Sequence, residues 1–445
     1  MTHQFKKIIF LLGDLLVLHA ALALTLLVRY RLIGRQDSLT PYWQGHWQYF
    51  LGVFVLFITV FYINSLYSLR QMAAIHSFTR RTLNSVVAAS LLAVIYFYLF
   101  PRVDIAPKTN LAIFAAIAAF GFLLWRRFAY WLISAQAWQN SLAIIGYDQR
   151  VISLVEELKS RPGLGYQTAL IFQNLTELQN LEANVINKNI RTIVLADDFG
   201  DDPKLRQTLF TLLRHRVSFI SYDNFYEQIN EKVPVESIKQ DWFLDNLQEG
   251  EKNYFDTLKK GLDFILAGAG LFISALLWPL LALLVKVSSP GPVFFTQARV
   301  GKNGQIFRLY KFRTMKVAGN DGGMTLPQDQ RITGIGRFLR SSRLDEIPQL
   351  INILKGEMSF IGPRPERPEF SAELEQKVPF YTTRLLVKPG LTGWDQISGE
   401  YHSPSADDTL KKLQNDLYYI KHRSFYLDAA IILKTIATVL GRGGR

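Results

Sequence analysis

The chain has 445 residues, of which 49% are hydrophobic and 20% are charged, and this balance excludes a disordered or low-complexity protein. It contains 0 cysteines, which excludes disulfides, thiolate nucleophiles and iron–sulfur clusters. The formal net charge of +13 favours an anionic partner: nucleic acid, an acidic lipid surface or a phosphorylated substrate.

The first third of the chain contains four long apolar runs. Almost no charged side chains interrupt residues 8–28, 48–69, 82–101 and 109–125. Because about 20 apolar residues cross a bilayer, residues 1–135 are predicted to form a four-helix transmembrane bundle. Lys and Arg in the connections favour a cytoplasmic N-terminus and a cytoplasmic end of the fourth run. Asp14 lies inside the first run and is expected either to serve a function or to sit in a packing contact or near the headgroups.

Residues 136–240 alternate short strands with helices. The pattern predicts strands at 141–145, 168–172, 191–195 and 217–221, with amphipathic helices such as 151–158 and 203–213 between them. Strand–helix alternation indicates a Rossmann-like, doubly wound parallel sheet. A dinucleotide site needs G-x-G-x-x-G after the first strand, and only Gly146 is present. We therefore favour a regulatory or dimerising module over a nucleotide site, followed by a polar linker at 241–260.

A fifth apolar run, residues 264–285, is interrupted by Pro279 and has basic residues on both flanks. A proline inside a helix removes a hydrogen bond and kinks it. A fifth crossing would also place the following basic region outside the cell. These features predict a re-entrant membrane helical hairpin bent at Trp278-Pro279, with an ordinary fifth span as the alternative. Residues 261–445 as a whole are predicted to form a mainly α C-terminal domain that ends in an amphipathic membrane-surface helix at 424–440.

Residues 286–343 carry eleven Lys or Arg and two Asp, directly after the apolar run. An electropositive surface beside a membrane segment suits a phosphate-bearing substrate, anionic lipid headgroups, or both. Nucleic acid is disfavoured because glycine turns interrupt the basic stretch and the stretch adjoins membrane-embedded sequence.

Two motifs can carry phosphate chemistry. Asp345 and Glu346 are adjacent carboxylates after a run of arginines, so one could attack phosphorus while the other holds Mg²⁺. The alternative is a capping box, because Ser342-x-x-Asp345 also fits that pattern. Two prolines fix the backbone around Arg364, which orients its guanidinium for a bidentate contact with phosphate. The alternative there is a surface turn with a solvated arginine.

Five ordered motifs resemble those of the bacterial sugar transferases, the monotopic phosphoglycosyl transferases. They are the Ser-Pro-Gly-Pro segment with its following glycines at 289–304, Lys-Phe-Arg-Thr-Met at 311–315, Leu-Asp-Glu at 344–346, Gly-Pro-Arg-Pro at 362–365 and Pro-Gly-Leu-Thr-Gly-Trp at 389–394. The resemblance covers about residues 259–440. With its four spans and α/β module, the chain looks like the long form, the undecaprenyl-phosphate hexose-1-phosphate transferases. Two positions depart from the family pattern: Trp278 stands where serine is frequent, and Asp395 where a small residue is usual.

The resemblance implies a reaction and a site. A UDP-sugar would donate sugar-1-phosphate to undecaprenyl phosphate and release UMP, as the initiating step of exopolysaccharide, capsule or O-antigen synthesis. The α/β module and the catalytic domain would lie on the cytoplasmic side of the bacterial inner membrane. Asp345 would be the nucleophile that forms a covalent intermediate, and Glu346 would bind Mg²⁺. The expected phosphate-holding and site-lining residues are Arg340, Arg364, Arg299, Lys311 and Arg313.

Two other functions remain open at this stage. The chain could be a non-catalytic membrane scaffold of polysaccharide assembly, or it could transfer sugar phosphate directly with Asp345 as general base. Likeness favours glucose or galactose as the sugar and leaves N-acetylated sugars and a homo-oligomer open.

Overall fold

The computed structural model describes residues 3–34, 40–67, 75–99, 107–134, 139–173, 177, 180–196, 203–316, 329–398 and 405–440. The last residues of the second and third predicted spans, 68–69 and 100–101, lie outside these ranges. The chain divides into two compact units, Met1–Asn230 and Glu231–Arg445.

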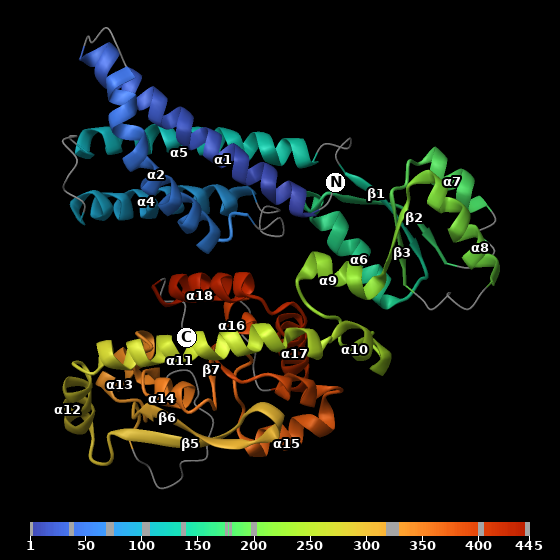
Figure 1. Ribbon diagram of the computed structural model, residues 1–445. Helices are drawn as coiled ribbons and strands as arrows, with labels where there is room; N and C mark the ends of the chain where they lie inside the picture. The colour runs from blue at the N-terminus through green and yellow to red at the C-terminus, as the bar shows by residue number, and fades with distance from the viewer. Residues whose placement is uncertain are drawn as a thin grey trace. The chain divides into compact units, whose positions relative to one another are not determined.

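The N-terminal unit begins with a helical bundle. Its helices are α1 (His3–Leu26) with its π-helical continuation η1 (Leu27–Ile33), α2 (Thr40–Ile63), α4 (Ile75–Leu99) and α5 (Pro107–Ser134). Four stretches are long and apolar enough to cross a membrane: Ile8–Ile33, Pro41–Ile63, Phe78–Leu99 and Thr109–Leu132. The helix α5 packs against both α1 and α4 (Figure 1). The prediction of four apolar N-terminal helices is confirmed.

Aromatic rings fill the centre of the bundle, and one ion pair is buried near its end. Phe57 of α2 packs edge-to-face against Phe114 of α5, and both side chains are fully buried. Asp14 of α1 is fully buried and accepts a hydrogen bond from the guanidinium of Arg126 of α5 at 2.5 Å. Of the roles considered for Asp14, the structure supports a packing contact, one that ties α1 to α5.

The second part of this unit is a parallel sheet in the order β2-β1-β3-β4. Its strands are β1 (Asn140–Ile145), β2 (Tyr166–Phe172), β3 (Thr192–Leu195) and β4 (Ser218–Ser221), and its helices are α6 (Gln149–Ser160), α7 (Leu181–Asn187), α8 (Pro203–Leu212) and α9 (Tyr222–Asn230). The predicted doubly wound α/β module is therefore present. The Asp148 carboxylate caps α6 by accepting from the Val151 amide at 2.9 Å, so a carboxylate already lies where a pyrophosphate would bind in a dinucleotide fold.

The C-terminal unit is mainly helical, as predicted. Its helices are α10 (Gln240–Asn246), α11 (Asn253–Ser274), α12 (Trp278–Ser288), α13 (Gly334–Ser341), α14 (Gln349–Leu354), α15 (Pro368–Lys377), α16 (Trp394–Ile397), α17 (Ala406–His422) and α18 (Phe425–Leu440). Strands β5 (Phe294–Val300) and β6 (Ile306–Phe312) form an antiparallel hairpin, and β7 (Ser359–Ile361) pairs in parallel with β8 (Gly390–Thr392).

The segment predicted as a polar linker, 241–260, is largely helical and lies in the C-terminal unit. It contains most of α10 and the start of α11. Trp242 belongs to one buried cluster with Leu417 and Ile420 of α17, and Val233 and Val235 join the same cluster. Apolar contacts therefore attach residues from 233 onward to this unit.

The fifth apolar run forms a bent helix pair. The axis turns by 67° between the end of α11 at Ser274 and the start of α12 at Trp278. The break precedes the expected Trp278-Pro279 position because Pro279, in the first turn of α12, needs no amide hydrogen there. The indole of Trp278 donates to the Ser274 hydroxyl at 3.2 Å across the break.

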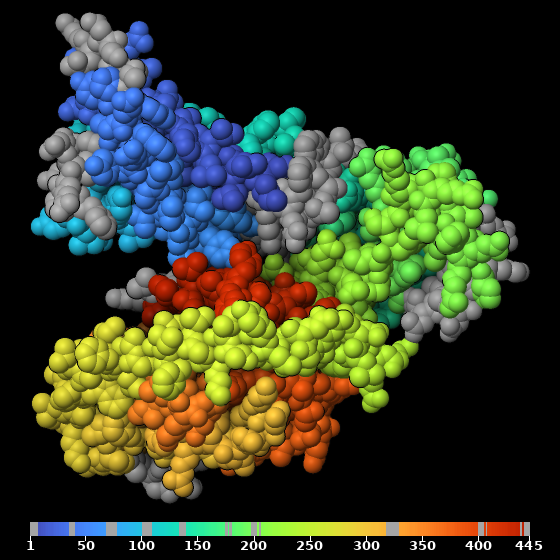
Figure 2. Space-filling model, in the orientation of Figure 1, coloured from blue at the N-terminus to red at the C-terminus, as the bar shows by residue number. Residues whose placement is uncertain are grey.

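Large apolar side chains on α11, on α12 and in the break between them are exposed. Phe272 is 83% exposed, Leu276 88% and Val287 78%. In Figure 2, α11 and α12, coloured yellow-green to yellow, form part of the surface of this unit. Large exposed apolar side chains in such number mark contact with a membrane or another protein.

Candidate active site

The hairpin β5–β6 places a lysine at the centre of the site. Lys311 lies opposite Phe295 in the antiparallel register, next to the end of β6. The strand β6 packs against α14 and against the 3₁₀ turn η9 (Leu344–Glu346), which carries the two adjacent carboxylates. A residue of the hairpin is thereby brought to carboxylates more than thirty positions later in the chain.

The carboxylates lie in a tight turn and not in a capping box. Arg343, just before η9, has φ = 58°, which turns the chain sharply after α13. The Ser342 hydroxyl donates back to the Phe338 carbonyl at 2.8 Å and does not cap η9. The capping-box alternative is therefore wrong, and both Asp345 and Glu346 are buried with their carboxylates left for other contacts.

Glu346 is surrounded by cations. Its Oε1 accepts from Lys311 Nζ at 2.7 Å and from Arg364 Nη2 at 3.4 Å, and its Oε2 lies 3.7 Å from Arg343 Nη1. Burial alone would raise the pKa of Glu346, but these three cations outweigh it and lower the pKa to about 2. Glu346 is therefore ionised at every physiological pH.

Asp345 has the opposite electrostatic balance. Burial, with the adjacent Glu346 charge, raises the pKa of Asp345 to about 6, although Lys311, Arg340 and Arg343 oppose the rise. Its Oδ1 is buried and has no hydrogen-bond partner among the described residues. At pH 7 this carboxylate is mostly charged, poorly solvated and unpaired at one oxygen, which are the properties of an activated nucleophile or base.

Lys311 belongs to the same electrostatic group. Burial lowers the pKa of the Lys311 ammonium, Glu346 opposes this effect, and the neighbouring Arg364 adds to it. Lys311, Glu346 and Asp345 therefore titrate as interacting groups and not as independent ones.

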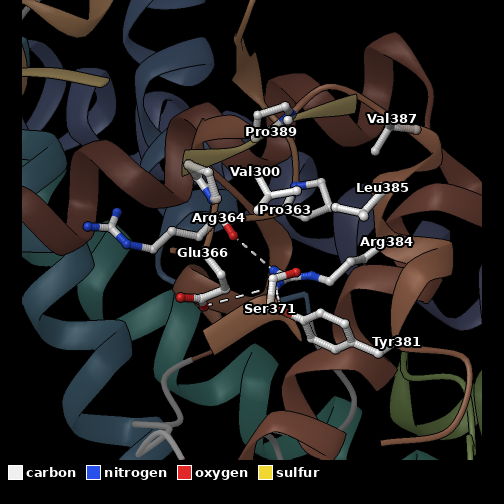
Figure 3. A pocket seen from close by; sticks show the side chains of 12 residues that line it. Val300, Pro363, Arg364, Glu366, Ser371, Tyr381, Arg384, Leu385, Val387 and Pro389 are labelled. Carbon is white, nitrogen blue, oxygen red and sulfur yellow. Dashed lines mark hydrogen bonds and ion pairs between the residues drawn. The ribbon is translucent and has the colours of Figure 1, made fainter. Parts of the chain in front are cut away.

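The Gly362-Pro363-Arg364-Pro365 loop follows β7 and brings Arg364 to Glu346. In Figure 3 the Arg364 side chain points away from Glu366 and Arg384, while its backbone carbonyl faces Arg384. Arg384 donates to that carbonyl at 2.9 Å. The loop thus presents the Arg364 guanidinium on one side and is held on the other.

Two of the predicted site arginines, Arg340 and Arg299, interact with different groups. Arg340, in α13, is close enough to lower the pKa of Asp345. Arg299 donates to the Pro365 carbonyl at 3.0 Å and to Gln297 Oε1 at 2.8 Å, so it holds the backbone of the Gly362–Pro365 loop. Burial, and then Arg364, lower the pKa of Arg299 to about 10.

Arg313 lies away from the carboxylates. Its guanidinium is buried and donates to the carbonyls of Ser289 at 2.6 Å, Pro290 at 3.1 Å and Val285 at 3.4 Å. These carbonyls follow or end α12, so Arg313 closes the C-terminal end of that helix. The structure brings Asp345, Glu346, Lys311, Arg340 and Arg364 together, and leaves Arg313 outside this group.

Sequence reasoning missed two functional candidates. Arg343 pairs with Glu346 three residues later, and its place in the basic run was the available signal. Arg384 is buried behind the loop, and no local pattern in the sequence marks it. Asp395, in the short helix α16, is buried and accepts from Asn415 Nδ2 at 2.9 Å, so it has a structural partner.

Residues 254–442 match the sequence model of a family described as bacterial sugar transferase. The chain is 44% identical over 191 residues to the UDP-N-acetylgalactosamine-undecaprenyl-phosphate N-acetylgalactosaminephosphotransferase of Aeromonas hydrophila, covering 42% of this chain and 45% of the relative. It is 44% identical over 273 residues to the UDP-glucose:undecaprenyl-phosphate glucose-1-phosphate transferase of Xanthomonas campestris pv. campestris, covering 58% and 54%. The chain therefore spans about half the length of these two relatives.

A longer alignment includes the N-terminal unit. The chain is 30% identical over 371 residues to the UDP-glucose:undecaprenyl-phosphate glucose-1-phosphate transferase of Klebsiella pneumoniae, covering 76% of each chain. The match to the family over the unit that contains the carboxylates, together with this alignment over three quarters of both chains, shows that the chain belongs to the bacterial sugar transferase family.

Proposed function

We propose that this protein transfers sugar-1-phosphate from a UDP-sugar to undecaprenyl phosphate and releases UMP, as the initiating step of exopolysaccharide, capsule or O-antigen synthesis. The names of the relatives support the general reaction, since they join an undecaprenyl phosphate acceptor to a UDP-sugar donor. The observation that carries the proposal is the carboxylate pair: Asp345 has an unpartnered, buried oxygen, and the adjacent Glu346 is bound by three cations.

In the proposed mechanism Asp345 is the nucleophile. One of its oxygens attacks the phosphorus that bears the sugar, and the bond from that phosphorus to the bridging oxygen of UMP breaks. UMP leaves, and the sugar phosphate remains on Asp345 as a mixed anhydride. A phosphate oxygen of undecaprenyl phosphate then attacks the same phosphorus and restores the free carboxylate. Lys311, Arg340 and Arg364 stabilise negative charge on the phosphate oxygens.

We also propose that Mg²⁺ binds at the carboxylate pair. Mg²⁺ is commonly held by one or two carboxylates together with substrate phosphates and water, and Asp345 Oδ1 is an oxygen without a partner in the described part of the chain. Glu346, with Asp345 beside it, would hold the ion. When bound, Mg²⁺ would neutralise charge on the diphosphate.

We further propose that α11 and α12 form a re-entrant hairpin at the cytoplasmic face of the bacterial inner membrane. The 67° bend and the exposed Phe272, Leu276 and Val287 support insertion of the bend into the bilayer. Lys286, about two turns after the start of α12, and the basic residues before the run would lie at headgroup height. The α/β module and the C-terminal unit would then lie on the cytoplasmic side, where UDP-sugars are found.

The direct test traps the intermediate. The purified protein is incubated with a panel of UDP-sugars and Mg²⁺ but without acceptor, and mass spectrometry of the peptide that contains Asp345 is expected to find one sugar phosphate. Adding undecaprenyl phosphate should discharge the adduct, and labelled UMP should exchange into the UDP-sugar when no acceptor is present. A chelator should prevent adduct formation, and added Mg²⁺ should restore it.

The variants separate the alternatives. Asp345→Asn should form no adduct and transfer no sugar phosphate, whereas Glu375→Gln, an exposed carboxylate on α15, should behave as wild type. Steady transfer with neither adduct nor exchange would favour direct transfer with Asp345 as general base. Absence of UMP release with every UDP-sugar would favour the scaffold.

A further inference from the structure

The loop that carries Arg364 is held through its carbonyl groups. Proline has no amide hydrogen, so a Pro-Arg-Pro segment has few backbone donors with which to fix itself. Each carbonyl from 363 to 366 accepts one hydrogen bond: Pro363 from the Gly390 amide at 2.9 Å, Arg364 from Arg384 at 2.9 Å, Pro365 from Arg299 at 3.0 Å and Glu366 from the Val300 amide at 2.9 Å. The carbonyl of Arg364 itself depends on one side chain, that of Arg384.

Arg384 is itself held in one orientation. Its Nε donates to Asp416 Oδ2 at 3.1 Å, its Nη2 lies 2.9 Å from the same oxygen, and its Nη1 donates to the Tyr381 hydroxyl at 3.0 Å. The side chains of Arg384 and Asp416 are only 3% and 2% exposed. A planar guanidinium bound on several edges has little freedom to rotate.

Glu366 connects this pair to the rest of the loop. Its carboxylate lies 4.0 Å from Arg384 Nη1 and 3.9 Å from Arg299 Nη1, and it forms an ion pair with Lys412. Lys412 and Asp416 lie one turn apart on α17. We call Arg384, Asp416, Glu366 and Lys412 the Arg384 brace.

We infer that Arg384 is a positioning residue for Arg364: by holding the Arg364 carbonyl, it sets the direction in which the Arg364 side chain reaches Glu346. The inference rests on the proposed function, in which Arg364 also contacts the donor diphosphate. Burying a charged pair stabilises a core little compared with apolar packing, which favours a geometric role for the brace. A displacement of about 1 Å at a reacting centre can reduce the rate about 100-fold.

The test is a double-mutant cycle on the full-length protein. Arg384→Lys keeps the charge but loses the planar fork, and is expected to lower kcat by roughly 10- to 100-fold with a smaller change in KM for the UDP-sugar. Because Arg384 acts through Arg364, the kcat/KM values of Arg364→Lys and of the double variant should agree within about threefold. If Arg384→Lys does not fold, Asp416→Asn takes its place in the same cycle.

The matched control is Arg423→Lys. Arg423 is another buried arginine, 2% exposed, that donates to Glu249 at 2.7 Å and to Asp256 at 3.1 Å but does not contact the loop. The Arg423→Lys substitution should lower the melting temperature while leaving kcat/KM of the folded protein within about twofold of wild type.

The outcomes are distinct. The effect of Arg384→Lys on kcat/KM is measured in wild type and again in the Arg364→Lys variant. If the reduction is the same in both, Arg384 acts on the fold and the inference is wrong. The inference is equally wrong if wild type transfers sugar phosphate and Arg364→Lys is as active. A wild type that transfers nothing contradicts the proposed function itself, and the inference falls with it.

Discussion

Replacing Asp345 by asparagine is expected to stabilise the C-terminal unit while abolishing transfer. Burial raises the pKa of Asp345 from its ordinary 3.8 to about 6. At about 1.4 kcal/mol per pH unit, keeping this carboxylate ionised costs the folded state roughly 3 kcal/mol. Asparagine has nearly the same shape and no charge, so the variant avoids that cost.

The sign of the effect makes it testable by pH. A carboxyl whose pKa is raised on folding contributes stability below its unfolded value of 3.8 and loses that contribution as the pH rises through about 6. The advantage of Asp345→Asn should therefore be small near pH 4 and complete above pH 7. For a unit of this size, roughly 3 kcal/mol corresponds to an increase of about 6–12 °C in melting temperature.

The assay is thermal unfolding in detergent micelles at pH 5 and pH 8, at one scan rate and without Mg²⁺ or nucleotide, because ligands would stabilise the wild type by mass action. Glu375→Gln, which removes an exposed carboxylate, serves as control and should melt with wild type at both pH values. The electrostatic reasoning is refuted if Asp345→Asn melts at or below wild type at pH 8, or if its advantage is the same at both pH values.

Three further predictions concern the same carboxylate and the bundle. The rate of adduct formation without acceptor should fall as the pH drops below about 6, because a protonated Asp345 is not nucleophilic, and a rate unchanged between pH 5 and 8 would contradict this. Lys311→Met removes the cation that most lowers the pKa of Asp345, so the acid limb of that pH profile should move to higher pH. An acid limb that stays in place or moves to lower pH would contradict the electrostatic interaction between Lys311 and Asp345. Asp14→Asn leaves the buried Arg126 without its counter-charge and should cost the bundle about 3–5 kcal/mol, seen as a lower melting temperature in detergent. The exposed Arg127→Gln is the control, and equal melting of the two variants would count against the buried pair.

The pattern of neighbouring residues in the sequence was sufficient to predict most of the helices and strands. The four apolar helices, the four parallel strands and the bent apolar pair each follow from composition and periodicity over neighbouring residues. The strands lie within two residues of the expected ranges, whereas the second apolar stretch begins at Pro41 instead of 48 and the bent pair extends over Asn253–Ser288 instead of 264–285. The segment 241–260 is where local pattern failed, because its polar residues suggested a linker while Trp242 packs against α17, a helix far away in sequence.

The choice of site residues shows the same division. Adjacent Asp345 and Glu346, and an arginine fixed between two prolines, are visible in the sequence because each depends on consecutive residues. Strand alternation would place positions 311 and 313 on one face, but β6 ends at Phe312, so Lys311 reaches Glu346 while Arg313 turns to the carbonyls of α12.

Composition and periodicity alone indicate helices long and apolar enough to cross a membrane, an α/β module and a carboxylate pair beside many cations. Which cations face those carboxylates, which of them hold backbone carbonyls instead, and the support of Arg364 by Arg384 follow from the packing of distant segments. Composition and periodicity act over a few residues, whereas burial and the partner of each charge depend on segments that meet only when the chain packs.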